Sequence, residues 1–395
     1  MFSLPRNIWI LTISLALFMS LGISVVFLGG IIGQSLAPSD SLSTFPVAFL
    51  VLGTASGIIP INRIMSIIGR RRTFLGVCVY TLLIILLAIV ALKIQSFYLF
   101  CFATFLFGVT TATMNQFRFA AIESVSQNLS ATATSTVLVG GLFSAFLGPE
   151  LATLGKDLFA TDFVGSFLLL GGCFIAAFGV LWFYHQTVPS QEHQPHSARC
   201  LSVITRQPVF IIAISSGAVG YVVMSYLMTA TPMSMHVIDG FSLEKTKFVI
   251  QSHVVAMFLP SLFTPLIVRW MGLGKMMLTG ILIYFICVAL AYSGHAFSNY
   301  WVSLILLGLG WNFLFIGGTS LLPRAYTEHE KFKVQALNDF LIFSVQALAS
   351  LSAGWFLFSY GWELTLLSVI PILLIQLSML IWWLNNKKQN LTTTY

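Results

Sequence analysis

Three polar side chains recur at helical spacing inside a strongly apolar segment of the chain. Thr111, Asn115 and Arg118 occupy positions i, i+4 and i+7, so they share one face of a helix. The guanidinium is always charged, and the amide and hydroxyl can both donate and accept hydrogen bonds. Lipid would leave these groups without partners, so this polar stripe is expected to face protein or water. There it can bind a solute, take part in proton coupling or pair with a carboxylate.

The depth of Arg118 leaves two roles open. If its helix begins near Phe97, the guanidinium lies about 30 Å along the helix, in the last third of a membrane span. There it either reaches lipid headgroups or closes a gate with a carboxylate, or it contacts the solute or a coupling proton directly. Asp339, in "KVQALNDFLIF", is the expected carboxylate partner. The alternative for Asp339 is a helix N-terminal charge favoured by the macrodipole.

Two more ionisable residues lie in apolar segments, where a charge is costly and therefore a candidate for function. Glu150 follows Pro149 and either carries a proton or stands in external water near the end of its helix. His253, in "VIQSHVVAMF", titrates near neutral pH and can couple a solute to protons. The alternative for His253 is a simple hydrogen bond to a neighbouring helix.

Two other segments carry groups suited to an aromatic or amphipathic solute. Trp311 and Asn312 supply an indole and an amide within "GLGWNFLFIGG". Tyr221 and Ser225 share a helix face at i and i+4. Helix packing is the alternative for Trp311, Asn312 and Tyr221.

The elements that position these residues follow from the composition. Of 395 residues, 57% are hydrophobic and 8% are charged, far below the roughly 25% charged residues of soluble domains. Twelve hydrophobic windows are long enough to span a membrane. They cover residues 8–33, 44–62, 73–94, 97–122, 132–154, 163–185, 208–234, 246–268, 275–294, 299–322, 334–357 and 364–385. The predicted fold is an all-α polytopic membrane protein with twelve transmembrane helices.

Several function classes are disfavoured by the rest of the sequence. The formal charge of +7 is spread over short connecting segments rather than gathered on one face, so no nucleic-acid partner is expected. The five cysteines have no ligand-like spacing, and no nucleophile-base set or Gly-rich phosphate loop occurs. The sequence therefore predicts no enzyme, no metal site and no cofactor.

The basic residues also predict an orientation. Fourteen of the 19 Lys and Arg residues fall in one set of alternating loops and four in the opposite set, while Arg118 belongs to neither. By the positive-inside rule both termini are expected in the cytoplasm. The protein is predicted to be a multi-pass component of the cell inner (plasma) membrane, with the lipid bilayer as its surroundings.

An internal repeat divides the chain. Gly69 in "GRRRTFL" aligns with Gly272 in "GLGKMML" at an offset of 203 residues, and Gly108 aligns with Gly310 at an offset of 202. The near-constant offset predicts two six-helix halves at 1–185 and 208–395, joined by a cytoplasmic linker at 186–207. Transporters built this way bind their solute near the midplane between the halves.

A family resemblance rests on the loop between the second and third windows. The stretch "GIIPINRIMSIIGRRRTFLG" resembles the corresponding cytoplasmic loop of the major facilitator superfamily, and Gly69, Arg70 and Arg71 match the end of its motif. The resemblance implies a monomeric secondary transporter in which this loop latches the cytoplasmic ends of the halves. The acidic position of the motif is Ser66 here, so the latch must form differently or more weakly.

Two further resemblances concern the solute. "GGLFSAFLGPE" is similar to the Gly-Pro element of helix five in family antiporters, but only Gly148 and Pro149 of its core are present, followed by Glu150. "QFRFAA" and "KVQALNDF" resemble a bacterial branch of the superfamily linked to uptake of small molecules such as riboflavin. The family's helices one, four, seven and ten line a central cavity, which the stripe on the fourth window is expected to face.

The sequence thus predicts a secondary active transporter that moves a small organic solute by alternating access and is coupled to protons. Arg118, Asp339 and either His253 or Glu150 are expected to link protonation to the exchange of access. Two alternatives stay open at this point. One is efflux of amphipathic compounds by antiport, and the other is a membrane receptor built on a transporter scaffold.

Overall fold

The computed structural model describes residues 4–125, 130–185, 199–327 and 330–392, so most of the predicted linker lies outside the described residues. Within these ranges the chain is helical and contains no strand. The helices of the first half of the chain are α1 (Arg6–Leu36), α2 (Phe45–Ile68), α3 (Arg70–Lys93), α4 (Phe97–Met114), α5 (Phe117–Glu123), α6 (Ser130–Leu154) and α7 (Val164–Trp182). Those of the second half are α8 (Leu201–Thr205), α9 (Pro208–Pro232), α10 (Leu243–Phe258), α11 (Thr264–Tyr292), α12 (Phe297–Leu321), α13 (Lys331–Leu367) and α14 (Ile370–Thr392). Shorter helical turns are η1 (Asp40–Leu42), η3 (Met233–Ile238), η4 (Leu259–Phe263) and η5 (Leu322–Ala325).

The described part of the chain has eleven stretches that are long and apolar enough to cross a membrane. The last of them, Lys333–Asn386, contains both α13 and α14, so the twelve predicted windows correspond to the twelve long helices. The prediction of an all-α polytopic protein is confirmed. The fourth window matches the apolar span Phe97–Ala121, but it is not one continuous helix, because α4 and α5 are separated at Asn115 and Gln116.

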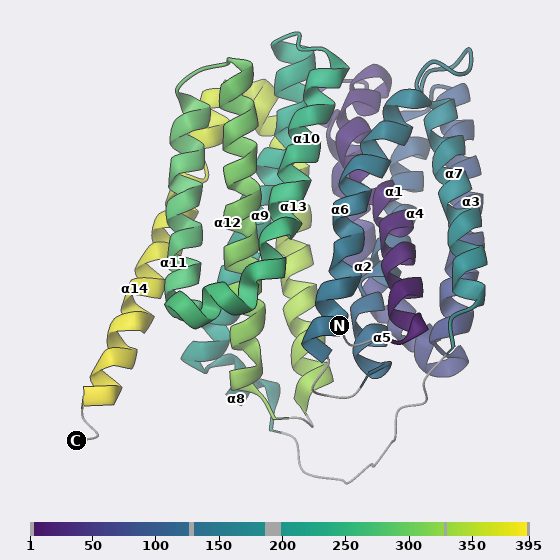
Figure 1. The fold of residues 1–395 in the computed structure, drawn as a ribbon. Coiled ribbons are helices and arrows are strands. Elements are labelled where there is room, and N and C mark those ends of the chain that lie inside the picture. The colour runs from purple at the N-terminus through teal and green to yellow at the C-terminus, as the bar shows by residue number, and fades with distance from the viewer. Residues whose placement is uncertain (1–3, 126–129, 186–198, 328–329, 393–395) are drawn as a thin grey trace.

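The long helices form a bundle and alternate in direction (Figure 1). Helix α1 begins and helix α14 ends at the same end of the bundle, which we call the terminal end; the other is the distal end. Helices of the first half lie on one side of the bundle and helices of the second half on the other. The two sides meet mainly where α2 packs on α13 and α6 packs on α10.

Two tight turns at the terminal end have the same backbone conformation. Gly69 joins α2 to α3 with φ 82° and ψ 162°, and Gly272 bends α11 with φ 74° and ψ 162°. Both φ values lie in the left-handed region, which glycine enters without the steric cost of a Cβ atom. These are the two glycines that the repeat aligns, so both copies of the motif place the residue type that the turn needs.

Close helix contacts shut the distal end of the bundle between its two sides. The Gly354 N–H of α13 donates to Thr44 Oγ1 next to α2 over 3.1 Å, and a Cβ atom at Gly354 would collide with the Thr44 side chain. On the neighbouring pair of helices, a Cβ atom at Gly30 of α1 would lie 2.8 Å from Met233 Sδ. Glycine at both positions therefore permits the closed arrangement.

Candidate functional site in a central cavity

A cavity of about 270 Å³ lies between the two sides of the bundle, close to the lower limit of typical ligand pockets, about 300 Å³. Its lining is mostly apolar, with a few polar groups. Eight of the nine predicted binding or coupling residues line it: Thr111, Asn115, Arg118, Tyr221, Ser225, His253, Trp311 and Asp339. The polar stripe of the first half thus faces a cavity rather than lipid, as its unsatisfied groups require.

An ion pair crosses the cavity between the two sides of the bundle. Arg118 Nη2 lies 3.4 Å from Asp339 Oδ2, joining α5 to α13, and the two side chains are 28% and 22% exposed. The break between α4 and α5 puts Arg118 in the first turn of α5, where the guanidinium also lies 4.8 Å from the ring centre of Phe119. Asp339 accepts a second hydrogen bond from Asn338 Nδ2 at 3.1 Å. The cavity therefore contains a cation and an anion that neutralise each other.

Aromatic rings of the second half form one wall of the cavity. Trp311 and Phe315 of α12 stack with ring centres 5.0 Å apart, and Tyr221 of α9 meets both edge-on at 5.3 and 5.0 Å. Phe343 of α13 lies 5.6 Å from Tyr221, and Phe258 of α10 lies 5.9 Å from Trp311. Edge-to-face and stacked pairs of this kind stabilise one another beyond simple burial. The wall is therefore an ordered surface suited to a flat ring.

Hydrogen bonds hold the polar groups of this wall in place. Gln346 Nε2 of α13 donates to Ser225 Oγ of α9 at 3.3 Å. His253 is fully buried, and its Nδ1 lies 2.8 Å from the carbonyl oxygen of Leu304 on α12. Asn312 is turned away from the cavity, because its amide donates to the Met257 carbonyl at 2.6 Å and ties α12 to α10.

Comparison with known proteins assigns the chain to a family. Residues 9–252 match the family described as the Major Facilitator Superfamily. The chain belongs to this superfamily. Membership makes the protein a membrane transporter rather than an enzyme.

Individual relatives agree with the superfamily assignment. Riboflavin transporter RfnT of Brucella anthropi is 35% identical over 381 residues, which cover 95% of either chain. The uncharacterised superfamily transporter YdeG of Bacillus subtilis is 28% identical over 358 residues, covering 85% of this chain and 82% of YdeG. The crystal structure of the human organic anion transporter MFSD10 (TETRAN) has a TM-score of 0.68 at 12% identity, covering 95% of this chain and 99% of that one. The last match concerns the fold alone.

The superfamily loop after α2 bonds to residues of its own side of the bundle. Arg70 clamps Glu123 of α5 with two hydrogen bonds of 2.8 and 2.7 Å. Arg71 Nη2 donates to the Trp182 carbonyl at the end of α7 over 2.7 Å. Gly69 supplies the turn that aims both arginines at these partners. Glu123 is therefore the acidic partner of this loop.

The Gly-Pro element packs α6 against α1. A Cβ atom at Gly148 would lie 2.7 Å from the Ser20 carbonyl oxygen, and the Gly148 carbonyl accepts from Ser24 Oγ at 2.9 Å. Pro149 lies inside α6, and its carbonyl accepts from the Thr153 hydroxyl at 3.0 Å. Gly148 therefore lets α6 pack closely on α1, and Glu150 follows this element in the same helix.

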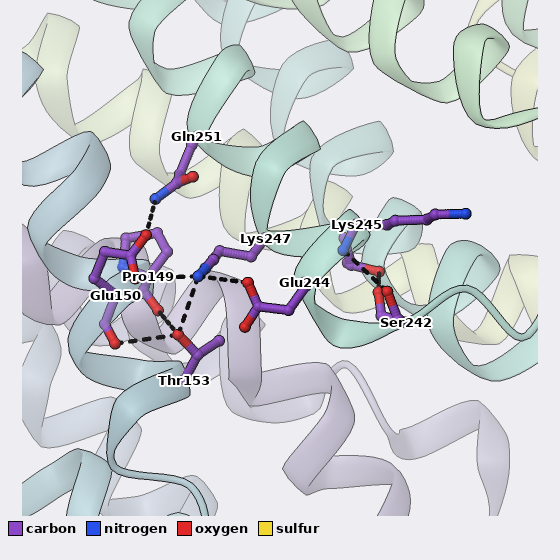
Figure 2. A network of polar contacts seen from close by, with 9 residues as sticks. Pro149, Glu150, Thr153, Ser242, Glu244, Lys245, Lys247 and Gln251 are labelled. Carbon is purple, nitrogen blue, oxygen red and sulfur yellow. Dashed lines mark hydrogen bonds and ion pairs between the residues drawn. The ribbon is translucent and has the colours of Figure 1, made fainter.

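Glu150 takes part in a distal network that joins α6 to α10. Figure 2 shows the Lys247 ammonium between two carboxylates, Glu150 at 3.1 Å on α6 and Glu244 at 2.7 Å on its own helix. Gln251 Nε2 donates to the other Glu150 oxygen at 3.3 Å, and Lys247 Nζ lies 3.4 Å from Thr153 Oγ1. Sequence reasoning missed Lys247 and Gln251. Their i, i+4 spacing on one face of α10 was the available signal.

A second distal network, also missed, joins three segments of the second half. His295 Nδ1 lies 2.9 Å from Asp239 Oδ2, and His295 Nε2 lies 2.8 Å from Glu363 Oε1. The Tyr300 hydroxyl donates to Asp239 at 2.7 Å. The two carboxylates, Glu363 first and then Asp239, raise the pKa of His295 above its ordinary value of 6.5. Asp239 and His295 lie in two different connections, and Glu363 lies in α13 beyond its bend at Gly361, so no local pattern reveals them.

Proposed function

We propose that the protein is a secondary transporter that imports a small organic solute by alternating access, with the solute bound in the central cavity. The observation that carries this proposal is the cavity itself. It lies between the two sides of the bundle, contains the predicted polar stripe and the aromatic wall, and is crossed by the ion pair of Arg118 and Asp339. A site between two halves that move against each other is the arrangement that alternating access needs.

The moving bodies in this proposal are residues 1–185 and 208–395, joined by a linker at 186–207, and the protein acts as a monomer. The shared conformation of Gly69 and Gly272 supports two related halves. The positive-inside rule assigns the terminal end to the cytoplasm of a cell inner membrane. The closed distal end then faces outward, and the described conformation is the one that releases solute inward.

Coupling to protons is assigned to the ion pair. Among the described residues that line the cavity, Asp339 is the one with a carboxylate. Its partner Arg118 lies on the other side of the bundle. Protonating Asp339 would remove the attraction across the cavity, and deprotonation would restore it. A proton that enters with the solute can therefore change the free energy of closing the terminal end, where Arg118 lies.

Riboflavin is the first candidate solute. The relative named for riboflavin transport is 35% identical over 95% of this chain, and the aromatic wall offers a surface on which a flat ring system can stack. This wall favours a flat ring over an aliphatic solute of similar size.

The proposal is tested with a bacterial strain that cannot make or import riboflavin. Expression of the chain should restore growth at low riboflavin concentration, and membrane vesicles should accumulate labelled riboflavin only while a proton gradient is present. Accumulation that survives collapse of the gradient would exclude proton coupling. Cells that lose riboflavin faster when the chain is expressed would show export and exclude import.

A further inference from the structure

Buried polar atoms without a partner surround the cavity. Among the described residues, the atoms without a partner include His253 Nε2, Trp311 Nε1 and Gln346 Oε1. All three side chains line the cavity, and each residue is at least nine-tenths buried. Arg118 Nε, on the opposite side of the cavity, is a fourth such atom. Folded proteins satisfy the large majority of buried polar atoms, so these exceptions around one cavity indicate groups that a solute has to satisfy.

The hydrogen bonds that these three residues already make determine whether each unpaired atom can donate or accept a further bond. A carbonyl oxygen only accepts, so His253 Nδ1 must carry the proton that it donates to Leu304, and His253 Nε2 is a bare acceptor. The indole nitrogen of Trp311 can only donate. Gln346 uses its NH₂ group on Ser225, which leaves its oxygen as an acceptor. The wall thus contains one donor and two acceptors just beneath its surface.

The remaining features of the cavity limit the shape and charge of its solute. The stacked and edge-on rings around Trp311 accommodate a flat ring system. Arg118 and Asp339 cancel each other, and the other described lining residues carry no permanent charge. A net-charged solute would have to leave water for a low-dielectric site without a counter-ion, which is unfavourable. While this ion pair is intact, the cavity therefore favours a neutral solute.

We infer that the transported solute is an uncharged, flat heteroaromatic compound with both hydrogen-bond donors and acceptors on its rim, and that Trp311, His253 and Gln346 select it. This inference rests on the proposed function and adds the chemistry by which the site recognises its solute. Donors on the solute bond His253 and Gln346, an acceptor on the solute bonds Trp311, and the rings stack on the aromatic wall. Riboflavin has this chemistry, and its phosphate ester does not because it is an anion.

The test compares binding of riboflavin, of the sugar-free ring lumiflavin and of riboflavin phosphate to the purified full chain, by quenching of flavin fluorescence. Trp311→Phe keeps a ring and removes the N–H donor, so riboflavin should bind about tenfold more weakly. Its matched control is Trp362→Phe, because Trp362 is equally buried and its indole nitrogen has no partner, but it lies outside the cavity lining. This control should bind riboflavin within about twofold of the wild type.

A second pair of variants tests the acceptor. Gln346→Met should also weaken riboflavin binding about tenfold. Gln376→Met is its control, because Gln376 is also buried and donates to a serine of α9, Ser216, at 2.9 Å but does not line the cavity. Gln346→Asn replaces the methionine variant if that one does not fold. The inference also expects lumiflavin to bind and riboflavin phosphate to bind at least tenfold more weakly than riboflavin.

The outcomes separate this inference from the proposed function. If both cavity variants bind riboflavin as tightly as their controls, the recognition inference is overturned while transport stands. A wild type that accumulates a charged or aliphatic solute through the same cavity also overturns it. If no solute accumulates in vesicles but riboflavin still binds with the expected variant pattern, recognition holds and the proposed transport fails.

Discussion

The ion pair of Arg118 and Asp339 is the charged contact across the cavity in the described structure. Its 3.4 Å separation and partial exposure correspond to a pair of modest strength, on the order of 1 kcal/mol. A contact of that size is strong enough to bias two conformations and weak enough to be broken in each transport cycle. A headgroup contact, a latch with Asp339 and a direct contact with the solute or proton predict different effects of substituting Arg118.

We expect Arg118→Leu and Asp339→Asn each to reduce uptake at least about tenfold, because each leaves the other charge without its partner at the cavity. Membrane insertion, measured by the amount of protein in the membrane fraction, should be unchanged. Arg63→Leu, at an exposed arginine of α2, is the control and should transport normally.

Exchanging the two charges distinguishes a latch from a direct role. The double variant Arg118→Asp with Asp339→Arg should recover part of the uptake if the pair only latches the two sides. It should stay inactive if either group contacts the solute or the proton at a defined place. Normal uptake by Arg118→Leu would contradict both the latch role and the direct role. Arg118 would then be assigned to a contact with lipid headgroups.

At the scale of elements, α6 and α10 meet through a lysine that has a carboxylate on each helix. Glu244 moves with Lys247, whereas Glu150 belongs to the other side of the bundle. If the distal end opens, the ammonium keeps Glu244 and does not lose all its partners. The bond to Glu150 is then the part of the network that favours closure.

Glu150→Gln should therefore shift the protein toward the distal-open state about fivefold, the effect of an ion pair of about 1 kcal/mol. The measurement is the rate at which an impermeant thiol reagent, added from outside, labels Met228→Cys in the cavity, in a Cys200→Ser background. Glu244→Gln is the matched control and should label within about twofold of the parent. Equal labelling of the two variants would show that Glu150 does not hold the distal end closed.

The His295 network predicts a pH dependence of stability. The pKa of His295 is raised in the folded protein, so the charged form of this histidine stabilises the fold. The stabilisation is therefore complete below about 6.5 and is lost as the pH rises through the folded-state pKa. The melting temperature of the purified protein should fall by about 2 °C over that rise. This fall in melting temperature should be absent in His295→Gln. If it persists in that variant, another group is responsible.

At the scale of the whole molecule, closure of the distal end depends on helices that approach without a side chain between them. Gly354→Val would put a side chain where Thr44 lies, so α2 and α13 can no longer meet. We expect uptake to fall at least about tenfold and external labelling of Met228→Cys to rise, because the inward-facing state is lost. Gly76→Val, at a glycine of α3 with open space around its Cβ position, is the control. Uptake at the parental rate in Gly354→Val would contradict this closure.

Much of this molecule could be predicted from the order of its residues. Lipid allows only segments whose backbone is satisfied internally, so apolar windows of sufficient length had to be helices. The same constraint required Thr111, Asn115 and Arg118 to avoid lipid, and all three line the cavity. The left-handed turns at Gly69 and Gly272 are likewise local, because the glycine and the turn stand at the same position.

Only the tertiary structure decided which groups meet. Lys247 lies 97 residues from Glu150, and Arg118 lies 221 residues from Asp339. Such pairs depend on how helices rotate and pack, which helical spacing does not specify. Asn312 turned to α10 while its neighbour Trp311 turned to the cavity, because adjacent positions on a helix point in different directions. Sequence therefore determined the helices and their polar faces, and packing determined the partners that make those faces a site.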